Sequence, residues 1–273
     1  MKRIILVCSA LVAIAIVGCG GGERASIMGN ISFYWDYYNP DSLIKSADIW
    51  GYKYNGFKMI PVLTINGDTL PMDGFQYTPT DFMYGGYITN INHGDECKFL
   101  VDYGEGKGEA TDTMPGAFSI TNPDTTYVLH KGNNLSISWS SATGADWYWV
   151  DVRINYFYRD TSGSWEDFYL DIDTIIEGTS LTINSVRIFP GYVDSVISGS
   201  GEVNVEAVNG PMTKPGEKGN IKGDAVGFFW CVYEAKEVWF GIEQFATRPE
   251  KDRSAEIRKK HLELMRNFAS ENE

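Results

Sequence analysis

The stretch that decides the fold is residues 147–159, which read Trp-Tyr-Trp-Val-Asp-Val-Arg-Ile-Asn-Tyr-Phe-Tyr-Arg. Side chains in a β-strand point alternately to two faces, so every second residue shares a face. One alternate set is entirely apolar or aromatic: Tyr148, Val150, Val152, Ile154, Tyr156 and Tyr158. The pattern therefore predicts a long strand that buries this set in a core.

The opposite face of the same strand mixes charge with large aromatics: Trp147, Trp149, Asp151, Arg153, Asn155 and Phe157. An aromatic surface of this kind can bind sugar rings or a protein partner, and its candidate ligand-binding residues are Trp147, Trp149 and Phe157. Alternatively, the first domain or the C-terminal helix covers the face. Covering is the favoured interpretation, and the sequence leaves both interpretations open.

The rest of the chain is predicted to be mainly β. From about Asn30 to Gly241, short runs of β-branched and aromatic residues alternate with Gly, Asn, Asp and Pro. This spacing is typical of antiparallel sandwiches rather than of alternating strands and helices. Asn66 and Gly67 tolerate positive φ angles and predict a tight hairpin between residues 60–65 and 69–72. A second hairpin is expected between residues 98–103 and 109–114.

Residues 135–139 read Leu-Ser-Ile-Ser-Trp, and residues 144–152 read Gly-Ala-Asp-Trp-Tyr-Trp-Val-Asp-Val. Together they resemble the B–C strand pair of fibronectin type III and related immunoglobulin-like domains, in which a Trp ends strand B and a Tyr-x-Val pattern opens strand C. The resemblance implies an immunoglobulin-like sandwich over roughly residues 116–245. In this interpretation no disulfide links the two sheets, so Trp139 and its neighbours must hold the core by packing.

The amino-terminal residues indicate export. Lys2 and Arg3 precede an uncharged run, residues 4–17, which is short for a membrane-spanning helix and is typical of a secretory signal. Residues 16–19, Ile-Val-Gly-Cys, resemble the lipobox of bacterial lipoproteins. The resemblance implies cleavage of a signal peptide, residues 1–18, and lipidation of Cys19 by palmitate or similar acyl chains. Residues 19–27 are predicted to be a flexible tether.

The lipid on Cys19 predicts a cell-envelope location and makes the membrane the first partner. In well-studied Gram-negative sorting, an Asp after the lipidated Cys retains lipoproteins at the inner membrane. The residue here is Gly20. We therefore expect the outer membrane if the cell has one, with the body periplasmic or surface-exposed.

The predicted organisation has five parts. After the signal peptide (1–18) and the tether (19–27) come an N-terminal β-domain (28–115), the immunoglobulin-like sandwich (116–245) and a C-terminal helix (246–273). Thr247 and Glu250 have the spacing of a capping box, and apolar residues recur at helical spacing after them. This amphipathic helix is expected to dock on a sandwich, and partner binding is the alternative.

Charge and motifs argue against several functions. The formal net charge is −13, which argues against nucleic acid as a partner, because phosphate binding needs a clustered basic surface. The sequence has three His and no zinc-binding pattern, no nucleophile elbow and no phosphate-binding glycine loop. Asp171 and Asp173 share a strand face where a calcium site with Asp146 or Asp151 is conceivable, but solvated acids are favoured. No metal or cofactor is predicted.

The cysteines Cys97 and Cys231 each lie in an apolar run. They can pair in an oxidising compartment, but we expect buried free thiols, because the two residues are placed in different domains.

The preferred function is a lipid-anchored, non-enzymatic envelope protein acting in binding, adhesion or envelope assembly, with a glycan or an envelope protein as partner. One alternative is a carbohydrate-binding module that uses exposed aromatics. The other is a glycan hydrolase built from two carboxylates.

Overall fold

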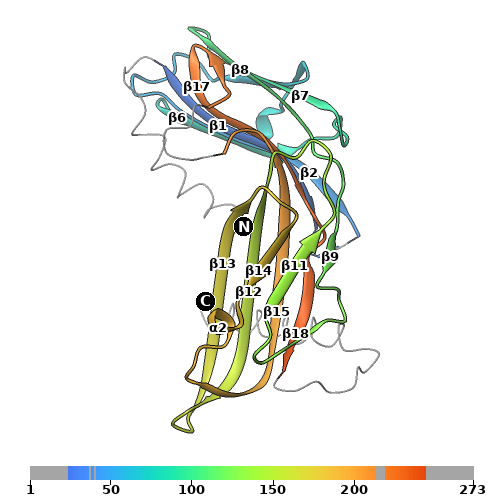
Figure 1. The fold of residues 1–273 in the computed structure, drawn as a ribbon. Coiled ribbons are helices and arrows are strands. Elements are labelled where there is room, and N and C mark those ends of the chain that lie inside the picture. Colours follow the sequence, from blue (N-terminus) through green and yellow to red (C-terminus); the bar gives the residue numbers. More distant parts are fainter. Residues whose placement is uncertain (1–23, 37, 40, 213–218, 244–273) are drawn as a thin grey trace. The chain divides into compact units, whose positions relative to one another are not determined.

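The computed structural model describes residues 24–36, 38–39, 41–212 and 219–243 (Figure 1). It is mainly β, as predicted. The chain divides into two compact units, each made of three stretches of sequence. Among the described residues, unit 1 comprises those up to 117 together with 142–147 and 207–234. Unit 2 comprises 118–141, 148–206 and those from 235 onward.

Several predictions lie outside the described residues: the signal peptide 1–18, the lipidated Cys19 and the C-terminal helix 246–273. The predicted tether, residues 19–27, extends too far, because strand β1 already begins at Ala25. Ala25 and Ile27 are fully buried, so the last three residues of that stretch belong to a sheet. In the part of the chain that the structure describes, none of the helices has the length and apolarity needed to cross a membrane.

Unit 1 contains strands of two sheets, whose inner faces pack as a sandwich. One has the order β17-β1-β2-β6-β5, formed by Ala225–Glu234, Ala25–Trp35, Leu43–Tyr52, Asp81–Tyr87 and Phe75–Tyr77. The other has the order β16-β8-β7-β3-β4, formed by Lys222–Gly223, Lys107–Thr113, Glu96–Asp102, Val62–Ile65 and Asp68–Thr69. A 3-10 turn, η1 (Met72–Gly74), precedes β5. Phe99 and Phe229 stack between the sheets with ring centroids 5.0 Å apart.

Both predicted hairpins are confirmed. β3 and β4 pair antiparallel around Asn66 and Gly67, whose φ angles are 53° and 87°. These positive values are those of a two-residue hairpin turn, which is the reason the sequence uses Asn-Gly there. The Asn66 side chain also accepts a hydrogen bond from the Lys98 N–H at 2.7 Å, which ties the turn to β7. β7 and β8 form the second hairpin.

The pairing of β1 with β17 differs from the antiparallel expectation, because these two strands run parallel. A short parallel pair also joins β10 (Val128–His130) to β18 (Val238–Glu243). At Gly227 the backbone of β17 approaches β1 so closely that an added Cβ would lie 1.7 Å from the Ile27 carbonyl oxygen. Gly227 also has a φ of 143°, which L side chains rarely adopt, so glycine is required here.

Unit 2 also contains strands of two sheets. The larger has the order β13-β12-β15-β18-β10, in which β13 is Trp165–Ile176, β12 is Trp147–Asp160 and β15 is Val193–Asn209. The smaller has the order β14-β11-β9, formed by Ser180–Ile183, Leu135–Trp139 and Ile120–Asn122. A single helical turn, α2 (Ser185–Ile188), is capped by the Asn184 side chain, which accepts a hydrogen bond from the Val186 N–H.

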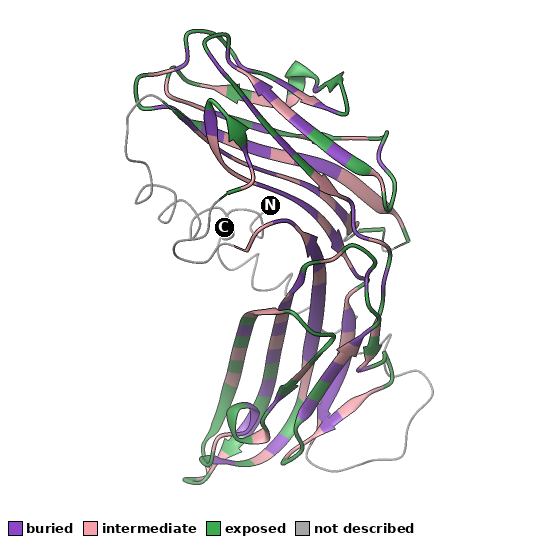
Figure 2. Ribbon diagram, turned by 45° about the horizontal axis from the view of Figure 1, so that its top comes forward, coloured by how far each residue is buried: buried purple, intermediate pink, exposed green. Residues whose placement is uncertain are grey.

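The core of unit 2 is built on the predicted face of β12. All six residues of that face are buried, and the strand alternates between buried and accessible positions (Figure 2). Trp139 on β11 packs edge-on against Tyr148 at 5.5 Å between ring centroids. The buried Tyr156 hydroxyl donates to the Ile188 carbonyl at 2.6 Å, so α2 supplies the partner that a buried phenol requires.

Cys97 and Cys231 are both buried, as predicted, and both carry free thiols in the structure. The reason given for that prediction is wrong, because both residues lie in unit 1.

Candidate binding surface

The candidate surface is the outer face of the β12–β13 hairpin in unit 2. Because the two strands pair antiparallel, residues that lie opposite each other share a face. The register pairs Arg159 with Trp165, Phe157 with Asp167, Asn155 with Tyr169, Arg153 with Asp171 and Asp151 with Asp173. These ten residues, together with Trp149, form what we term the outer face. Within the described chain, β13 pairs only with β12, so this face extends to an edge of the sheet.

One end of the outer face is aromatic. Phe157 and Trp165 stack with ring centroids 5.7 Å apart and an angle of 19° between the rings. Their exposed fractions are 39% and 51%, so the pair offers flat apolar area to solvent. The Arg159 guanidinium lies 5.8 Å from the Trp165 ring centroid, within range of a cation–π interaction.

The turn between the strands fixes this aromatic end. The Asp160 carboxylate accepts hydrogen bonds from the Ser162 hydroxyl and from the N–H groups of Ser162 and Ser164, at 2.8–2.9 Å. These donors, the Ser162 hydroxyl foremost, hold the pKa of Asp160 below its usual range. Arg159 donates to the Gly163 carbonyl. The turn therefore holds the first residues of β13, and with them Trp165, in place.

The other end of the outer face is polar and acidic. Arg153 forms an ion pair with Asp151, with 2.6 Å between the nitrogen and the carboxylate oxygen. The Asp173 carboxylate accepts a hydrogen bond from Trp149. Partial burial raises the pKa of Asp173, opposed by that hydrogen bond, and the Asp171 carboxylate raises it further. The paired charges leave this end with an excess of carboxylates, which favours neutral or cationic ligands over anionic ones.

The three aromatic residues predicted from the sequence occupy different environments. Phe157 is exposed, and Trp149 is half-buried and linked to Asp173. Trp147 is 4% exposed and belongs to unit 1, where its indole N–H donates to the Gly210 carbonyl at 2.9 Å. The outer face thus carries Phe157 and Trp149, at opposite ends, and leaves Trp147 out.

Sequence reasoning missed Trp165, Tyr169 and Arg159. Tyr169 is 61% exposed and donates to the Asp171 carboxylate at 3.3 Å. The signal was present in the alternation of residues 165–173, Trp-Glu-Asp-Phe-Tyr-Leu-Asp-Ile-Asp, which follows a Ser-Gly turn after the long strand. Treating residues 147–160 and 165–176 as one hairpin would have found it.

A metal site at the acidic end was conceivable from the sequence. Among the described residues there is no group of three or more His, Cys, Asp or Glu side chains arranged to hold a metal ion.

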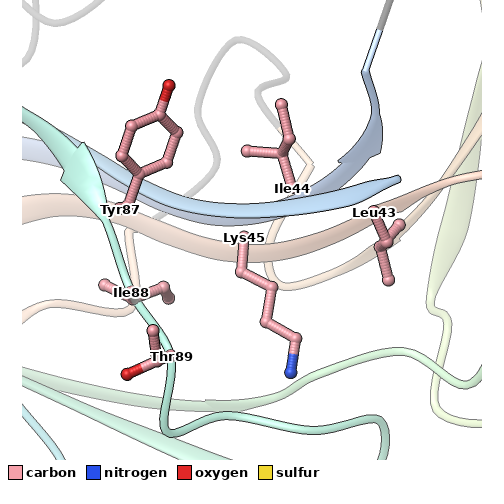
Figure 3. A pocket seen from close by; sticks show the side chains of 6 residues that line it. All are labelled: Leu43, Ile44, Lys45, Tyr87, Ile88 and Thr89. Atoms are coloured by element: carbon pink, nitrogen blue, oxygen red, sulfur yellow. The ribbon is translucent and has the colours of Figure 1, made fainter. Parts of the chain in front are cut away.

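Unit 1 has a shallow, open depression of about 440 Å³. Three residues of β2 and three at the end of β6 and just beyond it line the depression: Leu43, Ile44, Lys45, Tyr87, Ile88 and Thr89. The polar ends of Tyr87 and Lys45 point away from each other (Figure 3). Lys45 is committed elsewhere, since it donates to the Ile91 carbonyl and lies over the Phe33 ring. The depression therefore does not gather polar groups toward one point.

Two carboxylates of unit 1, Asp112 and Asp146, lie close enough to influence each other. Burial raises the pKa of Asp112 to about 7, and the Asp146 charge adds to the shift, opposed by a hydrogen bond from Asn220. Asn220 donates to Asp112 at 2.6 Å, and the Gly210 N–H donates to Asp146 at 2.9 Å. The first bond connects β8 with Asn220, which also bonds the Phe229 backbone in β17. The second bond connects Asp146 with the residue that follows β15.

The Asp112 carboxyl should make stability depend on pH. Its folded pKa of about 7 lies above the ordinary value of 3.8, so between these values the folded chain binds more protons than the unfolded chain. This group therefore lowers the free energy of unfolding as the pH rises from about 4 to about 7. We expect Asp112→Asn to be more stable than the native chain at pH 8 by about 1–2 kcal/mol, allowing for solvent screening of a partly exposed group. The advantage should vanish at pH 4.

Urea unfolding of both proteins at pH 4 and pH 8 measures this difference. An equal difference at the two pH values would contradict the assignment of the effect to Asp112.

A scan against protein-family models finds no match to this sequence, and a search of the curated proteins finds none either.

Proposed function

We propose that the protein is a lipid-anchored, non-enzymatic binding protein of the cell envelope, and that the outer face of β12–β13 is its binding surface. The observation that carries this proposal is the exposed stack of Phe157 and Trp165 on a fixed hairpin. A large exposed aromatic surface lowers the solubility of a protein and is typical of ligand-binding or protein-binding surfaces. Placing it on paired strands keeps the two rings ready for a ligand without a further ordering cost.

The ligand class that this surface fits best is a glycan. A sugar ring presents a face of C–H groups that packs on an aromatic ring, while its hydroxyls need hydrogen-bonding partners at the rim. Asn155, Asp167 and Tyr169 surround the stack with donors and acceptors. The surplus of carboxylates favours neutral or amino sugars over acidic polysaccharides. An envelope protein with a cationic or neutral surface is the other candidate partner.

Anchoring and location rest on the sequence. The basic start, the short uncharged run and the lipobox-like residues 16–19 support cleavage before Cys19 and its acylation. Two or more acyl chains give stable attachment, since each buried methylene contributes about 0.8 kcal/mol. Gly20 supports placement at the outer membrane in a cell that has one. The binding surface would then act outside the cytosol.

We also infer that unit 2 is an immunoglobulin-like sandwich of the fibronectin type III kind. Three features support this. The smaller sheet, β9-β11-β14, corresponds to strands A, B and E, and β12, β15 and β18 correspond to C, F and G. β13 takes the place of the extra strand C′ beside C. Trp139, at the end of the strand B equivalent, packs against Tyr148 on the strand C equivalent.

Trp165→Ala tests the binding surface. Removing this ring deletes half of the stack and the cation–π contact of Arg159. We expect glycan affinity to fall by about 10- to 100-fold, the cost of losing one stacked aromatic anchor. Retention on insoluble polysaccharides, followed by titration of tryptophan fluorescence with soluble fragments of those that retain the protein, measures the change.

Tyr54→Ala is the matched control, because Tyr54 is a 73% exposed aromatic of unit 1. The control should bind like the native chain. Loss of binding in both variants, or in neither, would remove the outer face as the site. Failure of the native protein to bind any member of a broad glycan panel would leave the envelope-protein partner, and release of sugars from the panel would favour the hydrolase.

A further inference from the structure

The two buried cysteines lie on facing strands of the unit 1 sandwich. Cys97 is in β7 of one sheet, and Cys231 is in β17 of the other. Two residues along each strand, Phe99 stacks on Phe229 at 5.0 Å between ring centroids. Both residues are 0% exposed, so both side chains lie in the space between the two sheets, where the Cys97 thiol neighbours the Cys231 thiol. Two buried cysteines on facing strands are the arrangement from which an inter-sheet disulfide can form.

We infer that Cys97 and Cys231 form a disulfide across the two sheets of unit 1 when the chain folds in an oxidising compartment. Both residues carry free thiols in the structure, so the bond forms by their oxidation. Two S–H bonds break, one S–S bond forms, and two electrons and two protons pass to the oxidant. The oxidant is a disulfide, of a protein or a small molecule, which is thereby reduced to two thiols. One cysteine attacks the oxidant's disulfide to give a mixed disulfide and releases the first thiol of the oxidant. The other cysteine then attacks the mixed disulfide at the first cysteine's sulfur, forms the Cys97–Cys231 bond and releases the second thiol of the oxidant.

Burial decides when this reaction takes place. The hydrogen bond between the two thiols, together with burial, raises the pKa of the Cys231 thiol well above its ordinary value. Only the thiolate attacks a disulfide, and the folded sandwich shields both sulfurs, so exchange is slow after folding. The bond therefore forms while the sheets assemble, and it then resists reduction. The proposed export supplies the oxidising compartment, but the pairing itself can be tested without it.

Refolding the full chain from denaturant with oxidised and reduced glutathione tests the pairing, with a reducing refolding reaction beside it. After alkylation of free thiols, trypsin places Cys97 in the peptide of residues 59–98 and Cys231 in that of residues 223–236, each with one cysteine. We expect mass spectrometry to find these peptides joined after oxidative refolding and separate after reducing refolding. Recovery of both as alkylated thiols, or each joined to glutathione or to the amino-terminal cysteine peptide, would overturn the inference.

A measurement of Tm tests whether the disulfide stabilises the native fold. Reduction of the oxidised protein should lower Tm by about 10 °C, as expected for a crosslink that closes a long loop. The double variant Cys97→Ala/Cys231→Ala should have the same Tm with and without reductant. An equal effect of reductant on the variant would assign the shift elsewhere and overturn the inference. If the chain is not exported, the two cysteine peptides will be unlinked in protein taken from cells, but they will still be joined after oxidative refolding. The export proposal and the disulfide inference can therefore fail separately.

Discussion

Replacing Cys19 with alanine is expected to abolish fatty-acid labelling of this protein and to move it from the membrane fraction to the soluble fraction. The acyl chains on Cys19 are proposed to be its attachment, and this variant lacks the apolar area that they provide. Metabolic labelling with an alkyne fatty acid, followed by detergent phase separation, measures both effects. The loss of label should be complete, because the lipid is bound to this one residue.

Cys8→Ala provides the matched control. Cys8 lies within the uncharged run of the proposed signal peptide, which the proposal has cleaved from the mature chain. This variant should keep its label and its membrane partition. Label retained by the Cys19 variant, or lost equally from both variants, would contradict the anchor.

Gly227→Ala is expected to destabilise unit 1 by about 2–6 kcal/mol, which is enough to leave much of the protein unfolded at 37 °C. The new methyl group would lie 1.7 Å from the Ile27 carbonyl oxygen, inside van der Waals contact. The φ of 143° adds backbone strain. The backbone must move, and that movement breaks the parallel pairing of β1 with β17.

Chemical unfolding followed by circular dichroism measures this loss. Gly178→Ala is the control, since an added Cβ there would have no heavy atom within 4 Å and the residue has no positive φ. It should change the free energy of unfolding by less than about 1 kcal/mol. Equal stability of the two variants would refute the account of the β1–β17 contact.

Local patterns in the sequence predict much of the fold. Alternation along β12 correctly identifies every residue of its buried face, and Asn66-Gly67 correctly identifies a hairpin turn. Both signals depend only on neighbouring residues. The parallel pairing of β1 with β17 was not predictable in this way. It joins segments that are far apart in the sequence, and the local residue pattern of neither segment indicates its partner.

The candidate site was predicted only in part, because local patterns do not show which strands pair. Phe157 and Trp149 follow from the alternation of β12, but the stack needs Trp165, which comes from the next strand. Trp147 was predicted to lie on the outer face but does not. Its position in the alternation predicts the outer side of the strand, but the chain at Gly210 covers it and accepts a hydrogen bond from its indole. A contact with residues so distant in sequence cannot be read from periodicity.

The parallel pair of β1 and β17 also has a consequence for how the chain is made. Ala25 meets Ala225, so the first strand is 200 positions from its neighbour. Closing so long a loop is slow, and the partner does not exist until most of the polypeptide has emerged from the ribosome. During synthesis the β17 side of β1 therefore stays unpaired, which would suit the proposed export of an unfolded chain. Truncation before residue 225 should leave residues 25–117 without a stable fold, although they form a continuous segment.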